Sequence, residues 1–177
     1  MNLENRDFTI CLVRPPSVVN VASYIASLTP PIGLAYIQAS LKAEGFNSVL
    51  VDAVGENPLQ SIKVNDHQVL RGLSFEETIS RIPKQTQLIG ISCMFSSEWI
   101  HVRTLINLIG ENFPGIPIIG GGEHFTAAPD ISMKQCKALT ACVLGEGEKT
   151  IVDVANAIRT DNDYRTLPGL AVTNNGH

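Results

Sequence analysis

The chain has 177 residues, of which 44% are hydrophobic and 17% are charged, and this balance predicts one globular domain rather than a disordered segment. Its net charge of −4 and the lack of a lysine- or arginine-rich run argue against a nucleic-acid partner. No apolar stretch is long enough to span a membrane, and the first residues lack the pattern of a secretory signal, so we expect a cytoplasmic protein.

Short apolar strands alternate with helical patterns along the chain. The expected strands are residues 8–13, 49–51, 88–95, 116–119 and 141–144. The expected helices are residues 32–44, 75–82, 98–112 and 148–159, and the second of them begins with a capping box of Ser74 and Glu77. Such a pattern is typical of a parallel sheet covered on both faces. The sequence therefore predicts an α/β fold, a flavodoxin-like doubly wound five-stranded parallel sheet with helices on both faces.

Three further segments do not belong to this minimal pattern. Residues 17–31 and 55–72 are longer connections than a compact domain needs, and long loops of this kind are often functional. Residues 126–135 could form a helix. At the end of the chain, residues 167–173 are strand-like and Asn174-Asn175-Gly176 is a hairpin signal. We expect a domain over residues 1–160, with residues 161–177 beginning a linker or hairpin toward a missing C-terminal domain.

Unusual sequence follows four of the predicted strands. These segments are Arg14-Pro15-Pro16 and residues 92–97, 120–124 and 145–148. Ligands of open α/β sheets bind in the crevice at the carboxyl ends of the strands, where all four segments are expected to meet. The sequence therefore places the candidate site at this edge.

The most informative of these segments is Gly120-Gly121-Gly122-Glu123-His124. Three consecutive glycines remove every Cβ from one place on the sheet edge, at a cost in backbone entropy and packing. The plain use of such a segment is to let a ligand approach the backbone closely. The pattern leaves two alternatives for His124, which could be a solvent-exposed loop residue or could contact a cofactor. Glu146 could accept hydrogen bonds from a ligand or favour the following helix N-terminus.

Motifs for phosphate-binding loops and dinucleotide-binding folds are absent from the sequence. A Cys93-dependent hydrolase or transferase remains an alternative, with His124 as base and Glu123 or Glu146 as the group that orients it. A non-catalytic module that binds a protein partner is a further alternative. Cys11, Cys93, Cys136 and Cys142 have no metal-type spacing, and we expect no metal site from them.

The segments at the strand ends together resemble a cobalamin-binding domain. In that family the third strand ends in a Ser, a Ser or Thr follows four residues later, and the fourth strand ends in Gly-Gly. The matching residues here are Ser92, Ser96 and the Gly120–Gly121–Gly122 triplet. One branch of the family carries Asp-x-His-x-x-Gly before its first helix, and Leu28, Pro30 and Gly33 occupy those Asp, His and Gly positions here.

Because Pro30 occupies the histidine position, the chain departs from that branch. It resembles instead the N-terminal cobalamin-binding domain of cobalamin-dependent radical S-adenosylmethionine enzymes. This resemblance also includes Pro30–Tyr36, Gly72–Glu77, Gly145–Glu148 and Leu167–Ala171, and it spans nearly the whole chain. It implies cobalamin bound in base-off form without a histidine ligand, in the B12-binding portion of a methyltransferase-type enzyme. S-adenosylmethionine and an iron–sulfur cluster would belong to an absent catalytic domain, in cis or in trans, because the chain has no Cys-x-x-x-Cys-x-x-Cys motif.

The resemblance also implies which residues contact the cofactor, and it implies no catalytic residue and no metal ligand in this chain. The implied cofactor-binding residues come from the loop before the first helix and from the ends of the third, fourth and fifth predicted strands: Leu28, Thr29, Pro30, Pro31, Ile32, Gly33, Ser92, Met94, Phe95, Ser96, Gly120, Gly121, Gly122, Glu123, His124, Gly145, Glu146 and Gly147.

Overall fold

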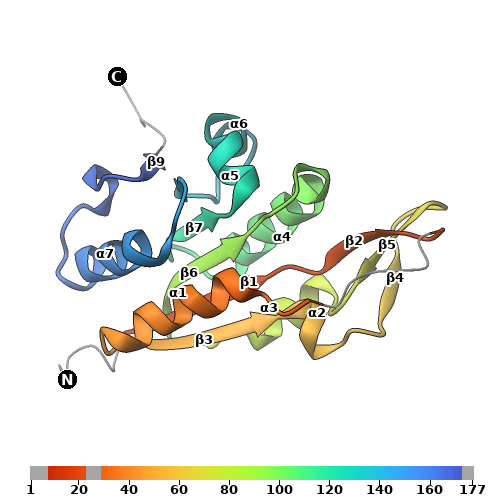
Figure 1. The fold of residues 1–177 in the computed structure, drawn as a ribbon, viewed down its shortest axis with the longest axis horizontal. Helices are drawn as coiled ribbons and strands as arrows, with labels where there is room; N and C mark the ends of the chain where they lie inside the picture. The colour runs from red at the N-terminus through yellow and green to blue at the C-terminus, as the bar shows by residue number, and fades with distance from the viewer. Residues whose placement is uncertain (1–7, 23–28, 173–177) are drawn as a thin grey trace.

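A computed structural model describes residues 8–22 and 29–172 of the chain. Its main sheet has the strands β1 (Thr9–Arg14), β3 (Asn47–Asp52), β6 (Thr86–Ser92), β7 (Ile118–Gly121), β8 (Ala141–Val143) and β9 (Leu170–Val172). Their order is β3-β1-β6-β7-β8-β9, and all neighbours are parallel except β8 and β9 (Figure 1). The first five of these strands confirm the predicted flavodoxin-like sheet.

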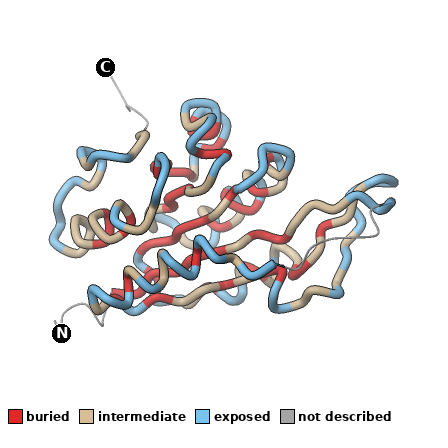
Figure 2. Tube along the Cα trace, in the orientation of Figure 1, coloured by how far each residue is buried: buried red, intermediate tan, exposed pale blue. Residues whose placement is uncertain are grey.

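Helices cover both faces of this sheet (Figure 1). One face carries α1 (Ile32–Ala43) and α7 (Glu148–Arg159), which pack on Ile10, Leu12, Ile119 and Val143. The opposite face carries the longer helix α4 (Trp99–Asn112) together with α3 (Phe75–Arg81) and α6 (Pro129–Gln135). Neighbouring strand residues alternate between the two cores, as the side-chain period of a strand requires. Figure 2 shows the buried residues concentrated in the strands and on the inner sides of the helices.

Most helix boundaries agree with the prediction. The structure confirms the Ser74–Glu77 capping box at the start of α3, with both reciprocal hydrogen bonds present. Residues 126–135 do not form one helix, because Pro129 separates α5 (Glu123–Ala127) from α6. The residue before a proline is pushed out of the helical region, and Ala128 accordingly has an extended φ of −140°. Glu98 lies in a 3-10 turn, η2 (Ser96–Glu98), that leads into α4.

The two long connections contain a small sheet that sequence patterns did not predict. The strands β2 (Ser17–Asn20), β4 (Ser61–Lys63) and β5 (Gln68–Arg71) form an antiparallel sheet in the order β2-β5-β4. The short helix α2 (Ala53–Glu56) lies between β3 and β4 in the chain. Figure 1 shows this sheet extending away from the main sheet beyond β1. Glu98 anchors it, since its carboxylate accepts hydrogen bonds from the Ser17 hydroxyl at 2.7 Å and the Val18 amide at 3.3 Å.

The segment after α7 contributes to the main sheet. It contains a 3-10 turn, η3 (Tyr164–Thr166), and β9, which pairs antiparallel with β8 as the edge strand. The expected strand over residues 167–173 is therefore shorter than predicted, and the expected Asn174-Asn175-Gly176 turn lies outside the described residues. None of the described helices is long and apolar enough to cross a membrane.

Candidate cofactor-binding site

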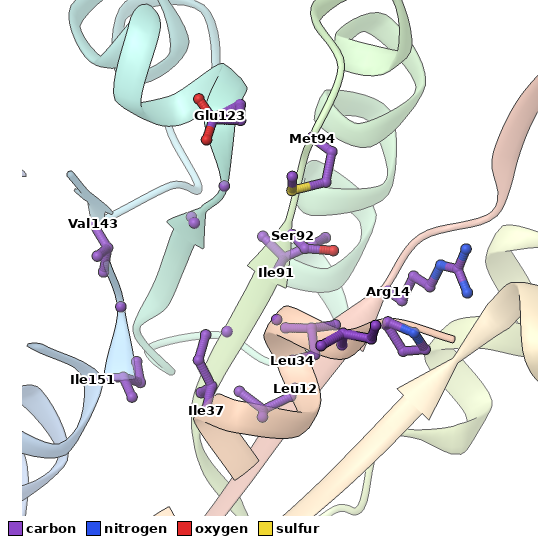
Figure 3. A pocket seen from close by; sticks show the side chains of 18 of the residues that line it. Leu12, Arg14, Leu34, Ile37, Ile91, Ser92, Met94, Glu123, Val143 and Ile151 are labelled. Carbon is purple, nitrogen blue, oxygen red and sulfur yellow. The ribbon is translucent and has the colours of Figure 1, made fainter. Parts of the chain in front are cut away.

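A cavity of about 500 Å³ opens at the carboxyl edge of the main sheet. It lies on the face that carries α1 and α7, and both helices begin at its border. Figure 3 shows Val143 and Ile151 on one side of the cavity and Leu34 and Ile37 on the other. The cavity is lined by all predicted cofactor-binding residues that the structure describes, except Ser96 and His124. Leu28 lies outside the described residues.

The three glycines at the end of β7 serve three different purposes. A Cβ on Gly120 would lie 2.7 Å from the ring of Phe125, so this glycine makes room for the core. Gly122 has a φ of +106°, and a Cβ there would lie 2.7 Å from the Cys93 carbonyl oxygen. Only Gly121 lines the cavity with nothing within 4 Å of where its Cβ would be. Gly121 is therefore the glycine of the triplet that leaves space for a ligand.

The end of β6 forms the neighbouring wall. Ser92 pairs with Gly121 in the strand register, and the Cys93 amide continues the ladder by donating to the Gly121 carbonyl at 2.9 Å. The strand ends at Ser92 rather than continuing to residue 95 as predicted. Beyond it, Met94 and Phe95 line the cavity with side chains 50% and 67% exposed. Apolar side chains exposed at the border of a cavity indicate that a ligand or another surface covers them.

Another wall is formed by the loop of residues 29–31 and by Ile32 and Gly33 at the start of α1. Arg14, at the end of β1, fixes its start by donating from Nη1 to the Thr29 carbonyl at 2.9 Å. The same nitrogen lies 3.3 Å from the Asp52 carboxylate, which also caps α2 by accepting from the Gly55 amide. Gly33 resembles Gly121, since nothing lies within 4 Å of where its Cβ would be. One arginine thus ties this wall to the sheet.

Two predicted contact residues do not line the cavity, because Ser96 is exposed beside it and His124 is buried behind it. His124 is buried, with 5% of its surface exposed, and its ring lies 4.8 Å from the ring of Trp99. Its Nδ1 is 2.9 Å from the Ser96 hydroxyl and its Nε2 is 3.1 Å from the Ser132 hydroxyl. Burial lowers the pKa of His124. The exposed-loop interpretation of His124 is therefore wrong, and the residue is a hydrogen-bonded part of the core.

The same geometry argues against Cys93 as a nucleophile. The thiol is buried and points to the Phe95 carbonyl at 3.5 Å, while both nitrogens of His124 are bonded to serines. Burial, with a smaller effect of the Glu98 charge, raises the pKa of Cys93 to about 12. A thiol with this pKa is not ionised at neutral pH, and no base is bonded to it. The four cysteines are all buried and free, as expected for small hydrophobic residues.

Sequence patterns missed the apolar floor of the cavity, and they placed Arg14 and Glu148 at the site edge without counting them among the cofactor contacts. The added lining residues come from strands β1, β6, β7 and β8 and from helices α1, α5 and α7: Leu12, Arg14, Leu34, Ile37, Gly90, Ile91, Ile119, Thr126, Val143, Glu148 and Ile151. Gly90 was the residue in the sequence that could have indicated this floor. It interrupts an apolar strand, and a Cβ there would lie 2.9 Å from Leu12.

Polar groups border this apolar floor at its open side. The charged lining residues are Arg14, Glu123, Glu146 and Glu148. Neither α1 nor α7 begins with a side-chain cap, although the Ile32 amide at the start of α1 donates to the Pro30 carbonyl at 2.9 Å. Helix N-termini favour anionic groups such as phosphate, but three of the four charged lining residues are acidic. The cavity therefore suits a large ligand with an apolar body and peripheral polar groups.

Fold and site together define a flavodoxin-like module with a cavity for a large organic ligand at the carboxyl edge of its sheet. Comparison with protein-family models matches residues 18–155 to the B12 binding domain. This match covers most of the chain, and the chain belongs to that family. The cobalamin-binding domain predicted from the sequence is thus confirmed.

The chain is also similar to two curated methyltransferases and, in fold, to two solved structures. An uncharacterized methyltransferase from Pyrococcus horikoshii is 27% identical over 94% of this chain and 33% of its own length. The cytidylyl-2-hydroxyethylphosphonate methyltransferase of Streptomyces wedmorensis is 31% identical over 84% of this chain and 28% of its own length. The chain thus spans about a third of the curated relatives it matches.

The solved structures are of the radical S-adenosylmethionine methyltransferase TsrM from Kitasatospora setae. The form with cobalamin and a 4Fe–4S cluster bound has a TM-score of 0.70 at 20% identity, covering 95% of this chain and 28% of TsrM. The form with tryptophan substrate and an S-adenosylmethionine analogue has a TM-score of 0.67 at 21% identity, covering 95% and 29%. This likeness establishes that the two proteins share the fold.

Proposed function

We propose that this chain binds cobalamin in base-off form, without a histidine ligand, as the B12-binding portion of a radical S-adenosylmethionine methyltransferase-type enzyme. The observation that carries the proposal is the open position at Gly121, in a cavity of about 500 Å³ at the ligand-binding edge of a B12-binding fold. The names of the relatives support methyl transfer as the reaction of the longer protein.

The residues around the cavity fit a corrinoid. Gly33 and Gly121 leave space on opposite walls, and Met94 and Phe95 offer exposed apolar contact area. Ser92, Glu123 and Glu146 can exchange hydrogen bonds with peripheral amides, and the first turns of α1 and α7 can receive a phosphate. When bound, the corrinoid supplies cobalt chemistry for methyl transfer. The chain's own residues bind and orient it and exclude water from its buried part.

The loop before α1 supports a corrinoid held without a histidine ligand. Pro30 lines the cavity at the position where the related branch of the family has its histidine, and none of the described lining residues is a histidine. A proline side chain has no atom that can coordinate cobalt. The lower face of the corrinoid would therefore lie against this loop without a protein ligand.

Retention of hydroxocobalamin on a desalting column tests the binding itself. We expect the wild-type chain to keep the colour and Gly121→Leu to lose it, because the new side chain fills the open position without a backbone clash. Ala43→Leu, at the exposed end of α1 away from the cavity, is the matched control and should bind like the wild type. A colourless wild-type protein would contradict the proposal, and so would equal retention by Gly121→Leu.

The absorption spectrum of the loaded chain tests the missing ligand. We expect wild-type protein to show a corrinoid without a nitrogen ligand on the lower face. Pro30→His should shift the spectrum toward the nitrogen-coordinated form, since imidazole is a strong ligand for transition metals. A wild-type spectrum that already shows nitrogen coordination would contradict the histidine-free part of the proposal, but it would not contradict cobalamin binding.

A further inference from the structure

The residues that line the cavity divide by burial into an apolar floor and a polar rim. The floor consists of buried side chains from β1, β6, β7, β8, α1 and α7: Leu12, Leu34, Ile91, Ile119, Val143 and Ile151. Every polar or charged side chain among the described lining residues is half-exposed or exposed. Figure 3 shows the rim residue Glu123 well away from Leu12 and Leu34.

The backbone beneath the floor is already hydrogen-bonded. Leu12, Ile91 and Ile119 each have a strand partner on both sides in the main sheet. The buried glycine between these strands leaves no gap, since a Cβ on Gly90 would lie 2.9 Å from Leu12. A polar ligand group that reached this floor would lose its water without gaining a partner, which weakens binding.

A cavity of this size encloses only part of a corrinoid. Its volume of about 500 Å³ is in the range that takes a drug-sized molecule, and a corrinoid is several times larger. The corrin ring carries amide side chains around its edge, which an apolar floor would leave unpaired. The aromatic base at the end of the nucleotide tail is the apolar end of the ligand. In a base-off corrinoid this base is released from cobalt, so it is free to enter the cavity.

The bases that corrinoids carry differ in polarity. Dimethylbenzimidazole, the base of cobalamin, has two methyl groups, one acceptor nitrogen and no N–H donor once it is joined to ribose. Adenine at the same place has an amino group that donates and three ring nitrogens that accept. Each of these groups needs a partner when it leaves water. An apolar floor therefore penalises adenine more than dimethylbenzimidazole.

We propose that the apolar floor selects corrinoids with a benzimidazole-type base over corrinoids with a purine base. The inference rests on the proposed function, since it assumes a base-off corrinoid, and it adds which class of corrinoid the chain takes. The purine is disfavoured because the described floor residues offer it no hydrogen-bond partner.

Spectroscopic titration with three corrinoids tests the selectivity. The probes are methylcobalamin, its analogue with adenine as the base, and methylcobinamide, which has no base. Acid titration of each free corrinoid gives its base-off fraction, and multiplying the apparent dissociation constant by this fraction removes the cost of releasing the base from cobalt. We expect the adenine analogue to bind about 10- to 100-fold more weakly than methylcobalamin. Methylcobinamide should also bind more weakly, because it leaves the floor uncovered.

A hydroxyl group on the floor tests the cause of the selectivity. Val143→Thr exchanges a methyl group for a hydroxyl on the cavity lining. Val154→Thr is the matched control, because it makes the same exchange in the same buried core at a position of α7 that does not line the cavity. We expect Val143→Thr to reduce the difference between the two bases about 3- to 10-fold, and Val154→Thr to keep the wild-type difference.

The outcomes separate this inference from the proposed function. Equal corrected affinities of the wild-type chain for the two bases would overturn the inference alone, and so would methylcobinamide binding as tight as that of methylcobalamin. An unchanged difference in folded Val143→Thr would also overturn it, because the floor would not be the cause. If Val143→Thr does not fold, the wild-type comparison decides. A wild-type chain that binds none of the three corrinoids would overturn the proposed function as well.

Discussion

The two walls of the cavity are built by different means. The wall at the ends of β6 and β7 continues the hydrogen-bond ladder of the sheet, through the Cys93 amide on Gly121 and the His124 amide on Cys93. The other wall is the loop of residues 29–31 with the first residues of α1, and Arg14 joins that loop to the sheet. The first wall is fixed by the fold itself, and the second depends on a side chain. Apart from the open position at Gly121, we therefore expect changes in the first wall to affect folding and changes in the second to affect ligand retention.

The largest effect is expected at Gly122, in the wall that belongs to the sheet. Gly122→Ala places a Cβ against the Cys93 carbonyl and forces a positive φ on alanine. We expect a loss of about 2–3 kcal/mol in the free energy of unfolding, the range for strained backbone conformations. Chemical denaturation measures it. Gly33→Ala, at an open position in the first turn of α1, is the control and should be neutral or slightly stabilising, because alanine favours a helix more than glycine does. Equal losses in the two variants would remove the distinction between the walls.

A smaller effect is expected at Arg14, in the wall that depends on a side chain. Arg14→Met keeps the apolar stem but removes the hydrogen bond to Thr29 and the ion pair with Asp52. We expect about 1 kcal/mol of lost stability, because Asp52 still caps α2 and partly exposed ion pairs contribute little.

Corrinoid release should change more clearly in this variant than stability does. We expect dissociation of hydroxocobalamin to become about 3- to 10-fold faster, as the loop loses its attachment. Asp52→Asn keeps the Arg14–Thr29 bond and should release the corrinoid at nearly the wild-type rate. Unchanged release from Arg14→Met would show that the loop is held by other contacts.

The contrast between the walls also explains what could be predicted from the sequence. Continuous apolar runs such as residues 10–13 are strong signals, because a buried parallel strand needs such a run, and they indicated the strands of the central sheet. The glycine triplet and the other strand-end segments indicated that the site lies at the carboxyl edge of the sheet, where ligands of such folds bind. Strands β2, β4 and β5 were not predicted from the sequence, because they have only three or four residues and are mostly half-exposed.

Long-range side-chain contacts could not be predicted. The burial of His124 depends on Ser96, Trp99 and Ser132, which come from three other elements. The attachment of Thr29 depends on Arg14, fifteen positions earlier in the chain. Likewise, the glycines at 120, 121 and 122 look identical in sequence, and only the neighbours of each Cβ position separate packing, backbone conformation and ligand space.

The thermal unfolding temperature with and without hydroxocobalamin tests the central claim most directly, because it reads folding and binding together. A ligand that binds only the folded state raises this temperature. The account predicts that wild-type chain melts at a higher temperature with the corrinoid, whereas Gly121→Leu melts near the temperature of ligand-free wild type in both conditions. A rise for Gly121→Leu as large as that for wild type would contradict the claim that Gly121 leaves space for the cofactor.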